Sequence, residues 1–262
     1  MSINWTQQHI VLTGATGGLG SALAKALTAR GASLTLVGRN QTALANLADA
    51  LQQDYVVADI TDAADRERLL QHLNVDSGIA TVTGLINNAG MAAEGTFEHQ
   101  CSQAEAMLNT NLLAPILLIN AVLPEFKRRS SFILNVGSVF GSIGFPGQTL
   151  YCATKSGLKG FTESLRRELS DTSVRVMYTA PRAIKTSFNG PLMRALNERT
   201  NTTEDDPHVV AQCIVRQIET GQLSQTIGFP ERLFAVLNMI RPQWLDGALF
   251  KVNRTFQSLI KE

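Results

Sequence analysis

The chain has 262 residues, of which 44% are hydrophobic and 17% are charged, and its formal net charge is +1. This length and hydrophobic content suit one large core, and so balanced a charge indicates neither a nucleic-acid partner nor a strongly acidic one. The three cysteines, at positions 101, 152 and 213, lack metal-ligand and disulfide spacing, so we expect no metal site and a reducing, cytoplasmic location.

Neither a secretory signal nor a membrane span is expected. The N-terminal stretch "MSINWTQQ" has no basic region followed by an apolar run. The most apolar stretch, 111–123, is broken by Pro115 and Asn120 and is too short to cross a bilayer. We therefore expect a buried helix there.

Short apolar runs typical of strands alternate with helical patterns along the chain as far as residue 181. Strands are expected at 9–13, 33–38, 55–60, 84–90, 131–138 and 173–181. Helices are expected at 21–31, 40–51, 62–73, 103–126 and 151–169. Because each strand is a continuous apolar run, we expect a parallel sheet covered by helices on both faces. This is an α/β, doubly wound Rossmann fold, with ligands at the carboxyl ends of the strands.

The pattern is less regular after residue 181. Residues 182–206 are mixed and form the expected substrate-loop region, and a helix is expected at 207–221, with a proline near its start. Residues 228–262 are an apolar, helical C-terminal extension. With no repeat and no linker, residues 1–262 are interpreted as a single domain.

The stretch "TGATGGLG" (13–20) lies between the first expected strand and the first expected helix. Glycine lets the backbone approach a pyrophosphate closely, and the N–H groups of a helix N-terminus face that anion. This context favours a dinucleotide site over a plain tight turn.

Further motifs follow at characteristic spacings. "NNAG" is 87–90, "NTNLLAP" carries Asn111, and "NVGS" ends the fifth expected strand with Ser138. Tyr151 and Lys155 then lie four residues apart, on one helical face. Together with the glycine loop, these motifs resemble the short-chain dehydrogenase/reductase family from about residue 9 to about residue 190. The resemblance implies an NADP(H)-dependent oxidoreductase that interconverts a ketone or aldehyde and an alcohol by hydride transfer.

The resemblance implies four catalytic residues whose roles agree with elementary chemistry. Tyr151 would be the general acid or base, and Lys155 would lower the phenol pKa towards 7, which takes about 4 kcal/mol of anion stabilisation. Ser138 would donate a hydrogen bond to the substrate oxygen. Asn111 would hold a water that relays protons to Lys155.

Arg39 follows the second expected strand, where an acidic residue would favour NAD. Because the planar guanidinium of Arg39 can donate two hydrogen bonds to the 2′-phosphate of NADP, we expect NADP rather than NAD. The resemblance implies Asp59 at the adenine ring. The expected cofactor contacts are Gly14, Thr16, Gly18, Leu19, Gly20, Arg39, Asp59, Ile60, Asn88, Ala89, Gly90, Tyr151, Lys155, Pro181, Ile184 and Thr186.

Two features depart from the family pattern. Arg182 stands where the family usually has a glycine, and it could crowd the loop or receive an anionic substrate group. Gly14, Gly17 and Gly20 also fit the spacing of the longer sugar-nucleotide branch. That branch adds a substrate domain for which this chain lacks the length.

The C-terminal extension carries two apolar helical faces. Leu245, Leu249, Val252, Phe256 and Leu259 form one, and Leu233, Leu237 and Ile240 form the other, before Pro242. Arg241, Lys251, Arg254 and Lys261 make this region mildly basic. Three interpretations stay open: completion of the core or a dimer contact, a lid over the cleft for a bulky apolar substrate, or shallow membrane association.

The expected partner is a small carbonyl or alcohol substrate. Two other functions are considered: a catalytically silent NADP-binding scaffold of the same fold, and a peripheral membrane protein. Relatives often pair through the helices that begin here near 103 and 151, so a homo-oligomer, a dimer or tetramer, is also expected.

Overall fold

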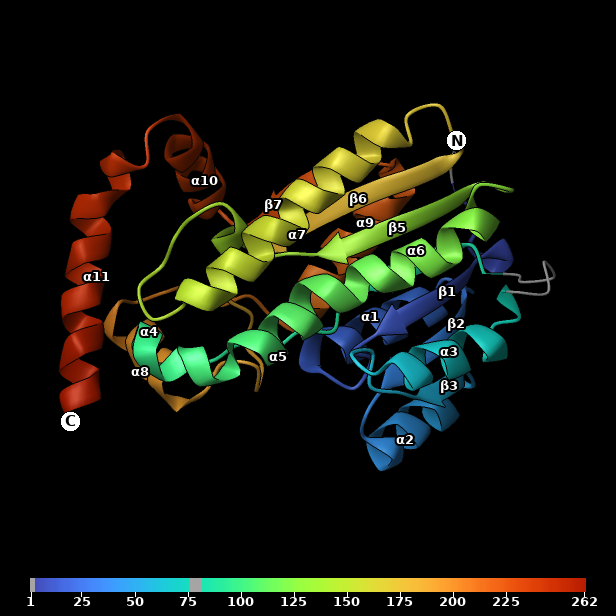
Figure 1. Cartoon of the computed structure of the whole chain (residues 1–262), viewed down its shortest axis with the longest axis horizontal. Coiled ribbons are helices and arrows are strands. Elements are labelled where there is room, and N and C mark those ends of the chain that lie inside the picture. The colour runs from blue at the N-terminus through green and yellow to red at the C-terminus, as the bar shows by residue number, and fades with distance from the viewer. Residues whose placement is uncertain (1–2, 76–81) are drawn as a thin grey trace.

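The computed structural model describes residues 3–75 and 82–262. Within them, seven parallel strands form one sheet in the order β3-β2-β1-β4-β5-β6-β7 (Figure 1). The strands are β1 (His9–Thr13), β2 (Ser33–Gly38), β3 (Asp54–Val57), β4 (Gly84–Asn87), β5 (Ser131–Val136), β6 (Val174–Pro181) and β7 (Ser224–Ile227). The order turns back at β1, so the carboxyl ends of β1 and β4 flank the switch point where ligands bind in such sheets.

Helices cover both faces of the sheet. They are α1 (Gly18–Thr28), α2 (Gln41–Leu51), α3 (Ala63–His72), α4 (Phe97–Gln100), α5 (Ala104–Leu108), α6 (Ala114–Phe126), α7 (Thr149–Glu168), α8 (Pro191–Arg199), α9 (Pro207–Thr220), α10 (Glu231–Ile240) and α11 (Gln243–Lys261). Shorter turns are η1 (Trp5–Gln7), η3 (Cys101–Gln103), η4 (Asn109–Leu113) and η5 (Val139–Gly141).

Alternate residues of each strand enter separate cores, as the two-residue period of a strand requires. Leu12 and Leu34 belong to one core with residues of α1, α2 and α9. Val11 and Val37 belong to the other core with residues of α3, α6 and α7. The doubly wound fold expected from the sequence is confirmed.

Some element boundaries differ from those expected. The third strand is shorter than 55–60, and β7 was not expected, because "SQTI" is short and largely polar. The mixed region 182–206 contains α8, which starts at a proline in the first turn. Each difference concerns a short segment whose structure depends on contacts with neighbouring elements more than on its own sequence periodicity.

The helix expected at 103–126 is part of a longer helical run, Phe97–Phe126, which consists of α4, η3, α5, η4 and α6. Its middle turn, η4, is a π-helix that contains the buried Asn111. By length and composition the run Phe97–Phe126 could cross a membrane, although 39% of its most apolar window is buried inside the protein. Met107 and Phe126 are core residues, whereas Leu113 is 46% exposed. The run is therefore a covering helix with one exposed face, where the sequence indicated a buried one.

The C-terminal extension forms two helices separated at Pro242, as expected. Figure 1 shows α11 at the end of the molecule, away from α2 and α3. Phe256 of α11 is buried against Met193 and Leu196 of α8, and its ring fills the space beside Gly147. The outward side chains of the extension stay exposed: Phe229, Leu233, Val236, Met239, Ile240, Trp244 and Phe250.

Phe256→Ala should lower the free energy of unfolding by about 3–5 kcal/mol, because it removes a fully buried ring from the contact between α11 and α8. Phe250→Ala, at a residue of the same helix that is 64% exposed, should change this free energy by no more than about 0.5 kcal/mol. Urea unfolding followed by circular dichroism measures both. Equal effects of the two substitutions would mean that α11 does not anchor through Phe256.

Candidate active site

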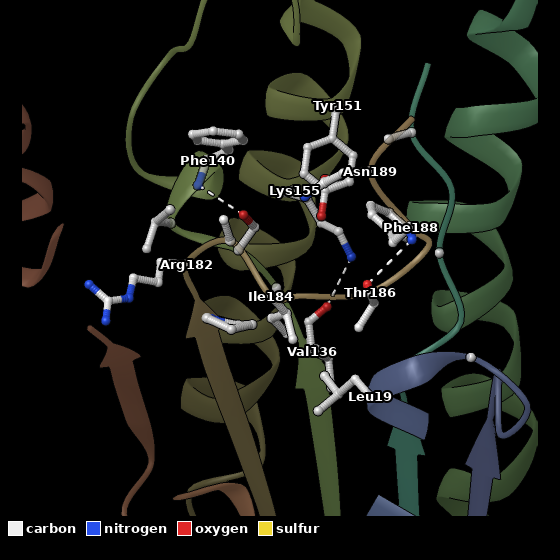
Figure 2. Close-up of a pocket in the computed structure, with 18 of the residues that line it drawn as sticks. Leu19, Val136, Phe140, Tyr151, Lys155, Arg182, Ile184, Thr186, Phe188 and Asn189 are labelled. Atoms are coloured by element: carbon white, nitrogen blue, oxygen red, sulfur yellow. Dashed lines mark hydrogen bonds between the residues drawn. The ribbon is translucent and has the colours of Figure 1, made fainter. Parts of the chain in front are cut away.

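A cavity of about 630 Å³ lies at the carboxyl ends of the strands. All of the residues expected to bind cofactor line it, as do Ser138, Tyr151 and Lys155. Asn111 does not line it. Figure 2 shows that Leu19, Val136, Ile184 and Thr186 surround the cavity below Tyr151 and Lys155. Residues from seven segments of the sequence thus meet at one edge of the sheet.

The glycine loop after β1 has the shape that a dinucleotide phosphate needs. Gly14 has φ +65°, a left-handed conformation that favours glycine. A Cβ on Gly20 would collide with the carbonyl oxygen of Gly14, which is backbone and cannot move aside. Gly17 caps α1 without a side chain, so the first N–H groups of α1 lie at the cavity wall. These features fit the pyrophosphate of a nicotinamide dinucleotide.

The loop after β4 holds the glycine loop in place. The Asn88 side-chain amide donates to the carbonyl oxygens of Thr13 (3.0 Å) and Gly14 (3.1 Å). The Thr13 hydroxyl accepts from the backbone N–H groups of Asn88 and Ala89. Asn88 therefore positions the backbone that would contact the cofactor. Thr13 was not expected in this role, because a threonine at a strand end has no distinctive motif.

Arg39 and Asp59 lie at the end of the cavity where the sequence predicts the adenosine of the cofactor. Arg39 Nη1 lies 3.7 Å from Asp59 Oδ2, and the Arg39 side chain is 79% exposed. Burial alone would raise the pKa of the Asp59 carboxyl, but hydrogen bonds from Thr61 and the charge of Arg39 lower it overall. Arg39 is thus an exposed cation at the cavity rim, free to turn towards a phosphate.

Tyr151 and Lys155 lie on one face of α7, as the spacing predicted. Lys155 Nζ donates to the carbonyl oxygen of Val136 at 3.0 Å and lies 5.7 Å from the centre of the Tyr151 ring (Figure 2). Both side chains are buried. The lysine thereby joins α7 to the end of β5, and the phenol faces the cavity.

Burial controls the protonation of this pair. It raises the pKa of the Tyr151 phenol well above its usual value, against the effect of a hydrogen bond from Ser138. Burial also lowers the pKa of Lys155 to about 8. The expected fall of the phenol pKa towards 7 is therefore absent from this structure. The rings of Phe140 and Phe188, 6.4 and 5.9 Å from the Tyr151 ring, withdraw the phenol from water.

Ser138 lies just beyond the end of β5. Its Oγ accepts from the backbone N–H of Phe140 at 3.1 Å, and its O–H donates to the Tyr151 phenol at the cavity wall. The Tyr178 hydroxyl lies 3.4 Å from the Ser138 backbone nitrogen, in space that only glycine leaves open at Gly137. Tyr178, a buried residue in β6, was not expected to support the site.

Asn111 acts through the backbone. Its Oδ1 accepts from the N–H of Met91 at 2.8 Å, and its Nδ2 donates to the Met91 carbonyl and to the Thr154 hydroxyl. The side chain thus ties the π-turn of η4 to α7 and to the loop after β4. The expected water relay to Lys155 is a hypothesis that these contacts leave untested.

Beneath the site, buried amides connect the sheet to α7. Asn87 Nδ2 donates to Asn135 Oδ1 at 2.9 Å, and Asn135 Nδ2 donates to the Thr162 hydroxyl at 2.9 Å. In an apolar interior such bonds are directional, so they fix how α7 sits on β4 and β5. Neither Asn135 nor Thr162 was expected to contribute.

Arg182 takes neither role that the sequence suggested. Its guanidinium forms a two-pronged ion pair with Asp205, at 3.0 and 2.7 Å, and lies 3.3 Å from a carboxylate oxygen of Glu231. Figure 2 shows it directed away from Tyr151 and Lys155. The hydrogen bonds that Arg182 donates to Asp205 raise the pKa of Arg182 above its usual value. Arg182 therefore links the loop after β6 to the first residue of α10.

The other end of the cavity is apolar. Phe140 and Phe145 stack with ring centres 4.6 Å apart, and Leu249 and Val252 of α11 also line it. Phe140 and Phe145 were not expected, because loop residues show no periodicity. Among the residues that the structure describes, no cluster of three His, Cys, Asp or Glu side chains could hold a metal ion.

Comparisons with known proteins agree with this geometry. Residues 8–197 match the short chain dehydrogenase family. The chain is 30% identical to an NADP-dependent 3-hydroxy acid dehydrogenase of Schizosaccharomyces pombe, covering 89% of this chain and 96% of that protein. It is also 30% identical to the 3-oxoacyl-[acyl-carrier-protein] reductase FabG of Rickettsia typhi, covering 96% and 97%.

Solved structures show the same fold. A short-chain dehydrogenase from Sphingobium yanoikuyae in complex with NADPH superposes with a TM-score of 0.78 at 27% identity, covering 91% of this chain and 95% of that one. One from Burkholderia phymatum in complex with NAD superposes with a TM-score of 0.82 at 20% identity, covering 92% and 96%.

Lys155→Met should reveal the buried ammonium as a pH-dependent stability difference. Because burial lowers the folded-state pKa to about 8 from the usual 10.5, the unfolded chain binds the lysine proton more tightly between these values. Wild-type stability relative to Lys155→Met should therefore rise as pH rises from about 8, by up to about 1.4 kcal/mol per pH unit. Urea unfolding without cofactor at several pH values measures this. Parallel curves would contradict the burial of a titrating lysine.

Proposed function

The chain belongs to the short-chain dehydrogenase family, and we propose that it is an NADP(H)-dependent oxidoreductase that interconverts a carbonyl compound and an alcohol. The observation that carries the proposal is that Ser138, Tyr151 and Lys155 come from two separate elements and line one cavity with the glycine loop. Proton donor, hydrogen-bond donor and cation thus share the space where a carbonyl would meet a cofactor.

In this proposal the bound cofactor supplies or accepts a hydride at its nicotinamide ring. Tyr151 gives its proton to the substrate oxygen, and the raised phenol pKa keeps that proton in place at neutral pH, the form that reduction needs. Ser138 donates a hydrogen bond to the same oxygen as negative charge develops. Lys155, with a pKa of about 8, is largely protonated at neutral pH, and its charge stabilises the phenolate that remains.

NADP rather than NAD is the proposed cofactor. The support is the exposed guanidinium of Arg39 at the rim beside Asp59. The Schizosaccharomyces pombe relative is named as NADP-dependent, and the Sphingobium yanoikuyae structure contains NADPH. The Burkholderia phymatum structure contains NAD, so the choice depends on Arg39 and is open to direct measurement.

The alternative functions have less support. A silent cofactor-binding scaffold has no need for a buried phenol and ammonium, whose burial costs stability. A homo-oligomer, the cytoplasmic location, the single-domain organisation and peripheral membrane contact stay predictions.

Tyr151→Phe should abolish carbonyl reduction and leave NADPH affinity largely unchanged, because only the transferable proton is removed. We expect kcat to fall by about 10² to 10⁴-fold. Cofactor absorbance measures turnover, and fluorescence titration measures binding. Tyr55→Phe, a half-buried tyrosine in β3, is the matched control. Retention of more than about a tenth of wild-type kcat would rule out Tyr151 as the acid.

Arg39→Ala should weaken NADPH binding by about 1.5–3 kcal/mol and affect NADH much less, because a charge-assisted bond to phosphate is lost. The ratio of the two Michaelis constants measures this. Arg68→Ala, an exposed arginine of α3 outside the cavity, controls for the change in net charge. If Arg39→Ala changes the Michaelis constants for NADPH and NADH by the same factor, Arg39 does not recognise the phosphate.

A further inference from the structure

We propose that the substrate carries its carbonyl or hydroxyl group on an extended apolar skeleton, a hydrocarbon chain or ring system, which binds against the inner face of α11. This inference rests on the proposed oxidoreductase function and adds the class of substrate. It also assigns the C-terminal extension a part in substrate binding.

The apolar face of α11 is divided between two uses. Phe256, towards its C-terminal end, packs on α8 as a core residue. Leu245, Leu249 and Val252, towards its N-terminal end, line the cavity. From residue 245 to residue 252 the helix rises roughly 10 Å. A substrate of a few atoms would leave most of this wall uncovered.

Other elements complete an apolar enclosure. The stacked rings of Phe140 and Phe145 line the cavity, as do Met193 of α8 and Phe234 of α10. Burying apolar substrate surface here is favourable, because it removes that surface from water. A small polar carbonyl gains little from these walls.

The charges lining the cavity argue against an anionic substrate. Within residues 3–75 and 82–262, its cationic side chains are Arg39, Lys155 and Arg182. Arg39 lies at the adenosine end, Lys155 is bonded to Val136, and Arg182 is paired with two carboxylates. A substrate carboxylate would therefore lose hydration without gaining a free cation as a partner. The carboxylate of a 3-hydroxy acid, the substrate in the name of the Schizosaccharomyces pombe relative, therefore fits this cavity poorly.

Two polar side chains at this end are bonded within the protein. Asn197 donates to Glu204, and Thr202 shares a hydrogen bond with Thr200. The amides of Gln148 and Asn189 supply further polarity at the wall. They suit one or two neutral polar groups on an otherwise apolar substrate.

The first experiment measures kcat/KM with NADPH for four carbonyl compounds: hydroxyacetone, pyruvate, cyclohexanone and undecanone. We expect undecanone to exceed hydroxyacetone and pyruvate by at least about a hundredfold, since each buried methylene contributes a several-fold gain. Preference for hydroxyacetone or pyruvate overturns the inference and leaves the oxidoreductase function intact.

The second experiment uses a pair of neighbouring residues on α11. Leu249→Ala should lower kcat/KM for undecanone by about tenfold and leave that for hydroxyacetone unchanged. Phe250→Ala, at a residue that is 64% exposed and does not line the cavity, should change neither. Leu249→Met should restore most of the loss. If Leu249→Ala affects both substrates equally, or neither, α11 is not a substrate wall.

If no carbonyl compound is reduced, the proposed function fails. A binding measurement then tests separately whether the cavity accepts an apolar compound. With NADPH present, undecanone should raise the thermal unfolding temperature of wild-type protein and Phe250→Ala, less so that of Leu249→Ala, and hydroxyacetone should raise none. Such a pattern supports an apolar site without turnover. Absence of any shift with undecanone overturns the inference as well.

Discussion

The parallel direction of all seven strands is the constraint on which the site depends. Every strand ends at the same edge of the sheet, so the segments that follow the strands are brought together however far apart they lie in the chain. The glycine loop follows β1, Asn88 follows β4, and Ser138 follows β5. Hydrogen bonds then convert proximity into geometry: Asn88 holds the glycine loop, and Lys155 ties α7 to β5. The sheet thus determines where these residues lie, and the hydrogen bonds determine how they are oriented.

The chemistry follows from placing polar groups in a dry cavity. Phe140 and Phe188 surround Tyr151, and burial is the main cause that raises its pKa and lowers that of Lys155. Burial thus favours the neutral form of both groups, and their ionised forms become sensitive to any charge that enters the cavity. An electrostatic change brought by a ligand has a larger effect here than it would have at the surface.

The sequence located the fold and the polar residues of the site because their signals are local. Tyr151 and Lys155 lie one helical turn apart, and the glycine loop joins two recognisable patterns. Their assigned roles stay predictions. Periodicity in the sequence indicated that α11 has an apolar face. In the structure, Phe256 on that face packs on α8, whereas Leu249 on the same face lines the cavity. Sequence periodicity is the same for a packed residue and a cavity-lining residue, so it could not distinguish these two roles. The pKa of Tyr151 depends on rings contributed by loops, and the partners of Arg182 lie 23 and 49 residues away in the chain. Such pairings leave no mark on local sequence.

The ion pairs of Arg182 have a thermodynamic consequence. The loop after β6 carries the expected cofactor contacts Ile184 and Thr186, and Arg182 joins the same loop to Glu231 at the start of α10. A ligand that held the loop in one conformation would therefore also restrict α10 through this ion pair. By thermodynamic linkage, a ligand that held α10 in place would restrict the loop. Where the two ligands share this loop, each tightens the binding of the other by the same factor. A substitution at Arg182 would remove this link between the loop and α10, so any such coupling between cofactor affinity and substrate affinity should weaken.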